Sequence, residues 1–266
     1  MDVLLGIAGT PESMYGRRKM TAHLNREGYA VSKRRVDRLM RELGLNGRVR
    51  GRKTRTTVPD PKAPRAPDLL KRDFTAAAPN RSWVADFTYV STWSGFVYVS
   101  FAIDCYSRAI VGWSAATIKT TPLVTNALRM GLWRRDKAGH AARDGLIHHS
   151  DAGSQYTSIR FAETLALEGI AASIGTVGDA YDNALAESTI GLFKTEAIRE
   201  DSPFRTGPLR QLEDVEWVTA NWVHWYNTAR LHSLLGNMPP DEYETSYYAD
   251  LDSSPEPGTE PRNEAA

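Results

Sequence analysis

The order of strand-like and helix-like segments between residues 83 and 198 constrains the fold more than any other feature of the sequence. Three apolar segments, 83–91, 96–104 and 110–115, follow one another with short turns between them, which predicts an antiparallel meander. Helices over 122–136, 159–167 and 182–198 then alternate with strands over 146–150 and 170–174, and a last helix is expected over 212–232. This order is typical of an α/β fold and excludes a β-sandwich or a helical bundle.

The charge is distributed unevenly along the chain. Residues 1–75 carry 18 Lys and Arg against 8 Asp and Glu, residues 76–235 carry 14 against 16, and residues 236–266 carry 1 against 8. A basic N-terminal third on a near-neutral body indicates a polyanionic partner such as nucleic acid, because Lys and Arg release counterions from phosphates. Charge alone leaves a solvated basic surface as the alternative.

Two short helices are predicted in the basic N-terminal part. Apolar residues at helical spacing indicate one helix that ends at Gly28 and a second that begins after Ser32 and ends at Gly44. A pair of helices with a glycine-bearing turn is typical of a helix-turn-helix, although small helical hairpins with solvated basic faces share the pattern. The candidate phosphate contacts of the second helix and of the following proline-rich segment are Arg34, Arg35, Arg38, Arg52 and Lys53.

Four regions are expected: a helical DNA-binding module over 1–46, a basic proline-rich linker over 47–80, an α/β core over 81–235, and a C-terminal segment over 236–266. Leu69, Leu70 and Phe74 are expected to dock as a short helix, and the acidic tail after Tyr248 is expected to be disordered. The single cysteine, Cys105, excludes a disulfide framework and a cysteine-based zinc site. With neither a signal peptide nor a membrane-spanning segment in the pattern, we expect a soluble, cytoplasmic protein.

Three carboxylates occupy positions that a metal site would use. Asp86 lies within an apolar strand, Asp151 follows the predicted strand over 146–150, and Glu187 lies in the first turns of a long helix that Asp182 or Asn183 can cap. Three carboxylates on separate elements can converge on a pair of Mg²⁺ ions, which prefer oxygen ligands and support phosphodiester displacement. Because the core region holds 16 carboxylates, spacing alone does not single out this triple.

Seven short motifs follow one another along the chain. They are Tyr15-Gly-Arg-Arg, Leu39-Met-Arg-Glu-Leu-Gly-Leu, Trp83-Val-Ala-Asp-Phe-Thr-Tyr, Ile103-Asp-Cys-Tyr-Ser-Arg, His149-Ser-Asp-Ala-Gly-Ser-Gln-Tyr, Asp182-Asn-Ala-Leu-Ala-Glu-Ser and Tyr226-Asn-Thr-Ala-Arg-Leu-His. From Tyr15 to Tyr243 the chain resembles the second-frame (OrfB) subunit of bacterial insertion-sequence transposases of the IS-three type. That family belongs to the retroviral-integrase-like DDE superfamily. Thirty-five residues separate Asp151 from Glu187, which is the spacing typical of the superfamily.

The resemblance implies an RNase H-like fold, a mixed sheet with flanking helices, for the integrase catalytic core over 81–235. It also implies that Asp86, Asp151 and Glu187 are catalytic and bind two Mg²⁺ ions, which Mn²⁺ could replace. The implied reaction is DNA cleavage that frees a 3′-hydroxyl, followed by attack of that hydroxyl on another phosphodiester.

The resemblance further implies roles for side chains around this triad. Lys194 is expected to face DNA near the terminal base pairs, with an ordinary solvated lysine as the alternative, and Gln155 is a second candidate DNA contact. Arg230 is expected to bind DNA or to clamp the last helix, as are Tyr226, Asn227 and His232. Asp104 is interpreted as a structural turn residue, His149 as a packed histidine, and Trp217, Trp222 and Trp225 as core or interface residues.

The implied partners are the transposon ends and target DNA, a second copy of the chain on DNA, and the first-frame (OrfA) product as a fusion or a complex, in a bacterial nucleoid. Two other functions remain open. The first is a catalytically silent DNA-binding accessory or repressor of transposition, which the intact triad disfavours. The second is a nuclease of RNA–DNA hybrids, which leaves the basic helical module without a purpose.

Overall fold

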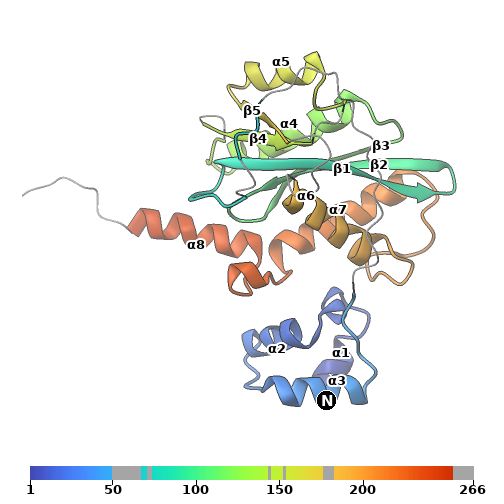
Figure 1. Ribbon diagram of the computed structural model, residues 1–266. Helices are drawn as coiled ribbons and strands as arrows, with labels where there is room; N and C mark the ends of the chain where they lie inside the picture. The colour runs from blue at the N-terminus through green and yellow to red at the C-terminus, as the bar shows by residue number, and fades with distance from the viewer. Residues whose placement is uncertain (50–66, 71–73, 143–144, 152–153, 176–182, 254–266) are drawn as a thin grey trace, which may run out of the picture.

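The computed structural model describes residues 1–49, 67–70, 74–142, 145–151, 154–175 and 183–253. Its centre is a five-stranded mixed sheet with the strand order β3-β2-β1-β4-β5 (Figure 1). The strands β1 (Ser82–Thr92), β2 (Gly95–Asp104) and β3 (Ile110–Ala116) form the predicted antiparallel meander. The short strands β4 (Ile147–Ser150) and β5 (Ala171–Ile174) extend the sheet in parallel beside β1.

Helices cover both faces of the sheet because alternate residues of β1 and β2 are apolar on each side. The helices α4 (Thr121–Lys137) and α5 (Ile159–Leu167) lie on one face, over a core that includes Trp83, Leu128 and Phe161. The helix α4 approaches β3 so closely that a Cβ atom at Gly112 would lie 2.0 Å from the backbone oxygen of Ala127. This α/β arrangement agrees with the expected fold class.

The opposite face is covered by α6 (Ala184–Phe193) and α7 (Leu212–Thr228). The helix α6 runs directly into the π-helical segment η2 (Lys194–Ile198), so that the two together make the predicted long helix. Phe101 of β2, Phe193 and Trp222 pack against one another here, with ring centroids 5.1 to 6.1 Å apart. Trp222 and Trp225 are core residues as predicted, whereas Trp217 is 62% exposed.

The N-terminal module consists of four short helical segments. They are α1 (Asp2–Gly6), η1 (Pro11–Met14), α2 (Arg17–Arg26) and α3 (Lys33–Glu42). As predicted, Ser32 caps α3, and its hydroxyl accepts a hydrogen bond from the backbone N–H of Arg35 at 3.3 Å. The apolar stripe of the two longer helices is buried in the same core cluster as Trp222 and Phe193, so the module packs on the α7 face of the sheet domain.

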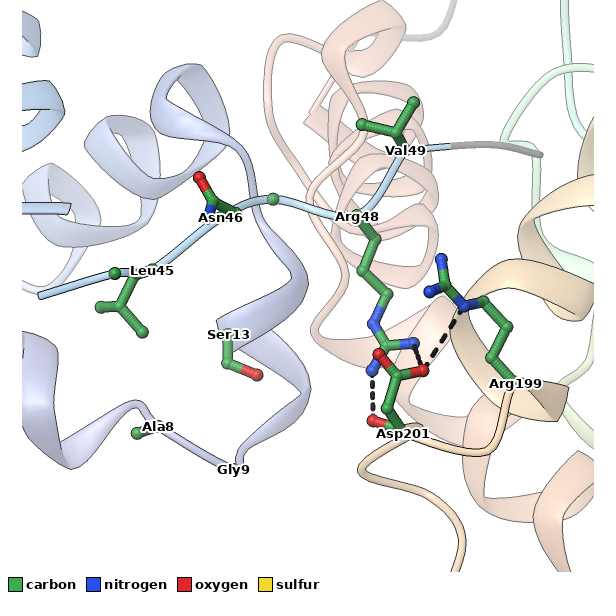
Figure 2. Close-up of a pocket in the computed structure, with 11 residues that line it drawn as sticks. Ala8, Gly9, Ser13, Leu45, Asn46, Arg48, Val49, Arg199 and Asp201 are labelled. Atoms are coloured by element: carbon green, nitrogen blue, oxygen red, sulfur yellow. Dashed lines mark hydrogen bonds and ion pairs between the residues drawn. The ribbon is translucent and has the colours of Figure 1, made fainter. Parts of the chain in front are cut away.

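Specific contacts join this module to the core. The Tyr15 hydroxyl accepts a hydrogen bond of 3.0 Å from the backbone N–H of Leu231, and the indole of Trp225 donates to Glu12 at 2.8 Å. Figure 2 shows Arg48 paired with Asp201 beside a pocket of about 440 Å³ between the module and the loop after η2. This pocket is lined by Ala8, Ser13 and Asn46 among others and includes none of the three candidate carboxylates.

Two local predictions were wrong, and a third is only partly covered by the described residues. Leu70 and Phe74 pack against the core as expected, but residues 67–70 form no helix, the backbone N–H of Leu69 donates to Ser173, and residues 71–73 lie outside the described part. The last predicted helix ends at Thr228 rather than at residue 232. The tail begins in a helix, α8 (Pro240–Ser253), because Tyr243 and Tyr247 pack on Tyr106 and Arg135 pairs with Glu244. The end of the tail, 254–266, lies outside the described residues. No helix of the described residues is long and apolar enough to cross a membrane.

Candidate active site

The register of two parallel strands places Asp86 and Asp151 next to each other. Strand β4 pairs with β1 only over Ser82–Ala85, and its last residue, Ser150, lies opposite Ala85. The next residue of each strand is a carboxylate. Because neighbouring strands of a sheet are about 4.8 Å apart, the two side chains start from adjacent positions at the edge where β4 ends. Both residues are half-buried.

Glu187 reaches the same edge from α6. Asn183 begins this helix, and its carbonyl oxygen accepts the backbone N–H of Glu187 at 3.0 Å. The Asn183 side chain does not cap the helix; its Nδ2 atom donates instead to the backbone oxygen of Ala85 at 2.9 Å. This hydrogen bond ties the start of α6 to the residue before Asp86, which brings Glu187 to the strand carboxylates. Asp182, the alternative cap, lies outside the described residues.

The charges of the three carboxylates act on one another. Burial raises the pKa of Asp86 well above its usual value, and the negative charges of Asp151 and Glu187 raise it further. Two contacts oppose this shift: the backbone N–H of Phe87, which donates to Asp86 at 2.7 Å, and the ammonium group of Lys194. Carboxylate oxygens are the ligands that hard divalent cations prefer, so the chemistry of these three side chains suits such a cation.

The three carboxylates are near one another without meeting at a point. Across the described ranges, no three side chains of His, Cys, Asp or Glu are gathered closely enough to hold one metal ion as they stand.

Lys194 lies beside this cluster rather than on an open helix face. It is half-buried, its Nζ atom is 4.8 Å from the centroid of the Tyr89 ring, and burial lowers its pKa while the charge of Asp86 opposes that shift. The geometry thus favours a site residue over a solvated lysine. Gln155 is also near the site in sequence, and its side-chain amide donates to the backbone oxygen of Lys119 at 3.1 Å.

Tyr156 is a neighbour of the site that the sequence analysis did not single out. Burial raises the pKa of its phenol well above the usual value, and the charges of Asp86 and Asp151 add to that effect. The phenol therefore stays neutral beside the carboxylates. Its position in the segment after Asp151 was the available signal, since a tyrosine five residues beyond a strand carboxylate can fold back over it.

Two predicted structural roles agree with the geometry. Asp104 is buried in the β2–β3 turn, where it accepts hydrogen bonds from the backbone N–H groups of Asn80, Tyr106 and Ser107 at 2.7 to 2.9 Å. His149 is buried in β4, with its Nδ1 atom 2.8 Å from the Ser173 hydroxyl. Both side chains are occupied by the fold.

The expected contact of Arg230 with DNA is not supported. Its guanidinium is buried and forms hydrogen bonds of 2.6 and 2.9 Å with the carboxylate of Glu196, which also accepts from the indole of Trp222. A guanidinium enclosed in this way cannot reach a phosphate, so Arg230 takes the alternative role of clamping the chain after α7. Asn227 acts similarly, because its side chain bonds both the N–H and the carbonyl of Ile110.

The basic residues of α3 are free to meet a ligand from solvent. Arg34, Arg35 and Arg38 are exposed, and Arg38 makes only a long, exposed ion pair of 3.6 Å with Glu42. Arg52 and Lys53 lie outside the described residues. The helical pair α2 and α3 with its glycine-bearing turn therefore presents a basic face, as the sequence analysis anticipated.

A mixed five-stranded sheet with carboxylates at the end of β4, on β1 and on α6 defines the chain as an integrase-core protein. Family models agree: two integrase core domain models match residues 76–180 and 168–240, and an HTH-like domain model matches residues 10–53. A solved structure with the same fold is the simian T-cell lymphotropic virus intasome in complex with PP2A regulatory subunit B56 gamma. Its matched chain has a TM-score of 0.51 and 15% identity, over 93% of this chain and 75% of that one.

Sequence relatives make the identification narrower. The transposase for insertion sequence element IS986/IS6110 of Mycobacterium tuberculosis is 50% identical over 236 residues, which are 89% of this chain and 83% of the relative. The transposase for insertion sequence element IS629 of Shigella sonnei is 45% identical over 238 residues, 90% of this chain and 76% of the relative. The chain belongs to the IS3 family of bacterial insertion-sequence transposases.

Proposed function

We propose that this chain catalyses metal-dependent cleavage and transfer of DNA strands during transposition. The observation that carries the proposal is the effect of Asp151 and Glu187 on Asp86: the charges of these two carboxylates, from separate elements, raise the pKa of Asp86 at one edge of the sheet. Such a cluster in a transposase core is best explained as a ligand set for divalent cations. Asp86, Asp151 and Glu187 would hold two Mg²⁺ ions, with Mn²⁺ as a substitute.

The reaction is a pair of phosphodiester displacements. In the first, a water oxygen bonds to phosphorus at the end of the element and the bond to the 3′ oxygen breaks, leaving a 3′-hydroxyl and a 5′-phosphate. In the second, that 3′ oxygen attacks a target phosphodiester and releases a 3′-hydroxyl on the target strand. Divalent cations, when bound, stabilise the attacking and the leaving oxygens.

The residues of this chain supply the setting for these displacements. The carboxylates keep the cation positions at the sheet edge, and Asn183 holds the start of α6 against Ala85 so that Glu187 faces the strand carboxylates. Lys194 presents a cation beside Asp86, where it would contact a DNA phosphate near the terminal base pairs. The exposed guanidinium groups of α3 would hold DNA farther from the cleavage point.

We further propose the assembly in which the chain works. The HTH-like module and core of one copy would bind one end of the element, so that two ends require at least two copies on DNA. The first-frame product would join as a fusion or a complex and contribute recognition of the ends. Coexpression with the frame upstream, and the mass of the resulting DNA complex, test both points.

We also propose that the chain is divided into the four regions 1–46, 47–80, 81–235 and 236–266.

The decisive experiment compares Asp151→Asn with Asp252→Asn, an exposed residue near the end of α8. A plasmid that carries the coding segment with its flanking DNA is the substrate, in Mg²⁺. Asp151→Asn should reduce cleavage and joining to background with DNA binding and melting temperature unchanged, and Asp252→Asn should retain both steps. Equal loss of binding and cleavage in Asp151→Asn would give the residue a structural role, and a wild-type chain that binds without cleaving would be an accessory or repressor.

A further inference from the structure

Two aromatic side chains stand exposed on the β1–β2 hairpin, beyond the point where β4 ends. Tyr89 is 39% exposed and Phe96 is 53% exposed, and their rings meet edge to face with centroids 5.1 Å apart. They lie on one face because Tyr89 is opposite Tyr98 in the antiparallel register, and Phe96 is two residues from Tyr98. Neither side chain is buried in the core, so packing alone does not explain the pair. We refer to Tyr89 and Phe96 as the aromatic platform.

The platform is connected to the carboxylate cluster through Lys194. The ammonium group of this lysine lies over the Tyr89 ring and at the same time acts on Asp86. It reaches both because, within the described residues, β4 covers β1 only over Ser82–Ala85, which leaves the edge of β1 from Asp86 onward open. Asp86 and Tyr89 are three residues apart in β1 and so project from opposite faces of the strand, and Lys194 is the side chain that lies near both.

The hairpin that carries the platform is held in place. The backbone N–H groups of Trp93 and Ser94 donate to the carbonyl oxygens of Leu209 and Arg210 at 3.2 and 3.0 Å. The guanidinium of Arg210 in turn lies 5.3 Å from the centroid of the exposed Trp93 ring. A hairpin fixed to the loop before α7 can offer its rings to a ligand without first being ordered, which lowers the entropy cost of binding.

The chemistry of this edge fits an unpaired nucleobase. Exposed rings bind bases by stacking, which tolerates any sequence because every base has a π face, and a neighbouring cation neutralises the adjoining phosphate. We infer that the platform of Tyr89 and Phe96 stacks an unpaired base of the DNA strand next to the scissile phosphate, with Lys194 on that phosphate. The inference rests on the proposed function, since it assumes that DNA is cleaved at the carboxylates.

The occupant would be the unpaired 3′ end of the scissile strand that fraying of the duplex exposes. Duplex DNA offers only stacked, paired bases, whereas a frayed end supplies a free π face within reach of the strand edge. The platform would thus discriminate between a DNA end with an unpaired overhang and a blunt end. This discrimination is separable from catalysis, because stacking requires no metal.

The test measures binding in EDTA, where no cleavage occurs. Two duplexes of the same sequence, one blunt and one with a short 3′ overhang that carries 2-aminopurine, are titrated with the full chain, and fluorescence quenching reports stacking of the modified base. The wild-type chain should prefer the overhang and quench it. Phe96→Ala should weaken overhang binding roughly fivefold to a hundredfold, with little effect on blunt DNA. Phe96→Tyr should restore both the preference and the quenching.

Matched variants separate the platform from general surface effects. Trp133→Ala removes an aromatic residue on α4 that is 60% exposed and should leave the preference unchanged. Tyr89→Phe keeps the ring under Lys194 and should behave like the wild type, whereas Tyr89→Ala should resemble Phe96→Ala. Equal weakening of blunt and overhang binding in Phe96→Ala would overturn the inference, as would a preference that survives in the variant.

Two further measurements distinguish base stacking from self-association of the chain and from catalysis. If the wild-type chain self-associates without DNA and Phe96→Ala abolishes that association, the platform is a contact between copies and the inference is wrong. A parallel cleavage assay in Mg²⁺ distinguishes the two proposals. If the chain prefers the overhang but does not cleave, the result supports the platform and contradicts the proposed function. If the chain cleaves DNA but does not prefer the overhang, the result supports the proposed function and contradicts the platform.

Discussion

The side-chain amide of Asn183 donates a hydrogen bond of 2.9 Å to the backbone oxygen of Ala85, across 98 residues of sequence. The donor is buried at the start of the helix that carries Glu187, and the acceptor immediately precedes Asp86. A single hydrogen bond therefore links the elements that bear two of the three proposed ligands. Its loss should affect the relative position of those ligands before it affects the fold as a whole.

We predict that Asn183→Ala weakens Mn²⁺ binding severalfold, as measured by electron paramagnetic resonance of the free ion. The variant should also lower the free energy of unfolding by about 1 kcal/mol, the usual net worth of one hydrogen bond. The matched control is Asn126→Ala, an exposed position on α4, which should change neither quantity. Loss of stability with unchanged Mn²⁺ affinity would reduce the Asn183 contact to a purely structural one.

The salt dependence of DNA binding should reveal the basic face of α3. If roughly five phosphates are neutralised by the basic N-terminal region, log K against log salt should have a slope of about −4 to −5 on duplex DNA. Changing Arg34, Arg35 and Arg38 to Gln together should reduce the slope to about −2, because each lost phosphate contact removes about 0.9. These side chains are exposed, so the triple variant should keep its melting temperature.

Substitution is a sharper test than deletion of residues 1–75, since the module shares its buried core with Trp222 and Phe193. Removal of that region would expose apolar surface of α7 and confuse binding with folding. The control changes the same net charge elsewhere, with Arg129, Lys137 and Arg160 to Gln on the exposed faces of α4 and α5. An unchanged slope in the α3 variant would mean that DNA is bound by the integrase core and not by α3.

The buried ion pair between Arg230 and Glu196 should contribute to stability and not to DNA affinity. Arg230→Met leaves the Glu196 carboxylate buried without its partner, which should cost about 3–5 kcal/mol in thermal or urea unfolding. The double variant Arg230→Met, Glu196→Leu should recover much of this loss, because no charge remains buried. If the Arg230 variant stays fully stable but loses DNA binding, Arg230 contacts DNA, as the sequence analysis expected.

His232 should make folding sensitive to mild acid. Burial, followed by the positive charges of Arg230 and Lys19, lowers the pKa of His232 to about 2; Tyr226 and Arg108 are its other neighbours. The unfolded chain, with a pKa near 6.5, then binds a proton that the folded chain rejects. Stability from this group is complete above pH 6.5 and decreases as the pH falls below that value.

His232→Gln should remove this contribution. Between about pH 6 and pH 4.5 the unfolding free energy of the wild type should fall more steeply than that of the variant, by up to about 1.4 kcal/mol per pH unit. Urea titrations at several pH values measure the difference. His224→Gln, on the exposed side of α7, is the control and should follow the wild type. Parallel curves for wild type and His232→Gln would contradict the depressed pKa.

Local pattern accounts for most of the fold. Strand β1, helix α5 and the cap of α3 by Ser32 lie where the sequence predicts them, because apolar periodicity and capping residues act over only a few positions. The sequence also predicted the order of the catalytic core and singled out Asp86, Asp151 and Glu187, through the motifs that surround them. These motifs are short, so a single sequence was sufficient to recognise them.

Only the tertiary structure decided which residues distant in sequence become hydrogen-bond partners. Arg230 looks like a DNA contact in its motif, yet it is enclosed because α7 packs on η2 and brings Glu196 to it. Asn183 looks like a helix cap, yet it bonds Ala85 because α6 packs on β1 and brings the start of the helix to that carbonyl. A buried polar side chain forms hydrogen bonds with whichever partner lies close to it, and the packing of whole helices and strands determines which partners are close. The sequence by itself therefore determined which elements form and which residues are candidates for the chemistry, and the packing of those elements decided which polar side chains are enclosed by the fold.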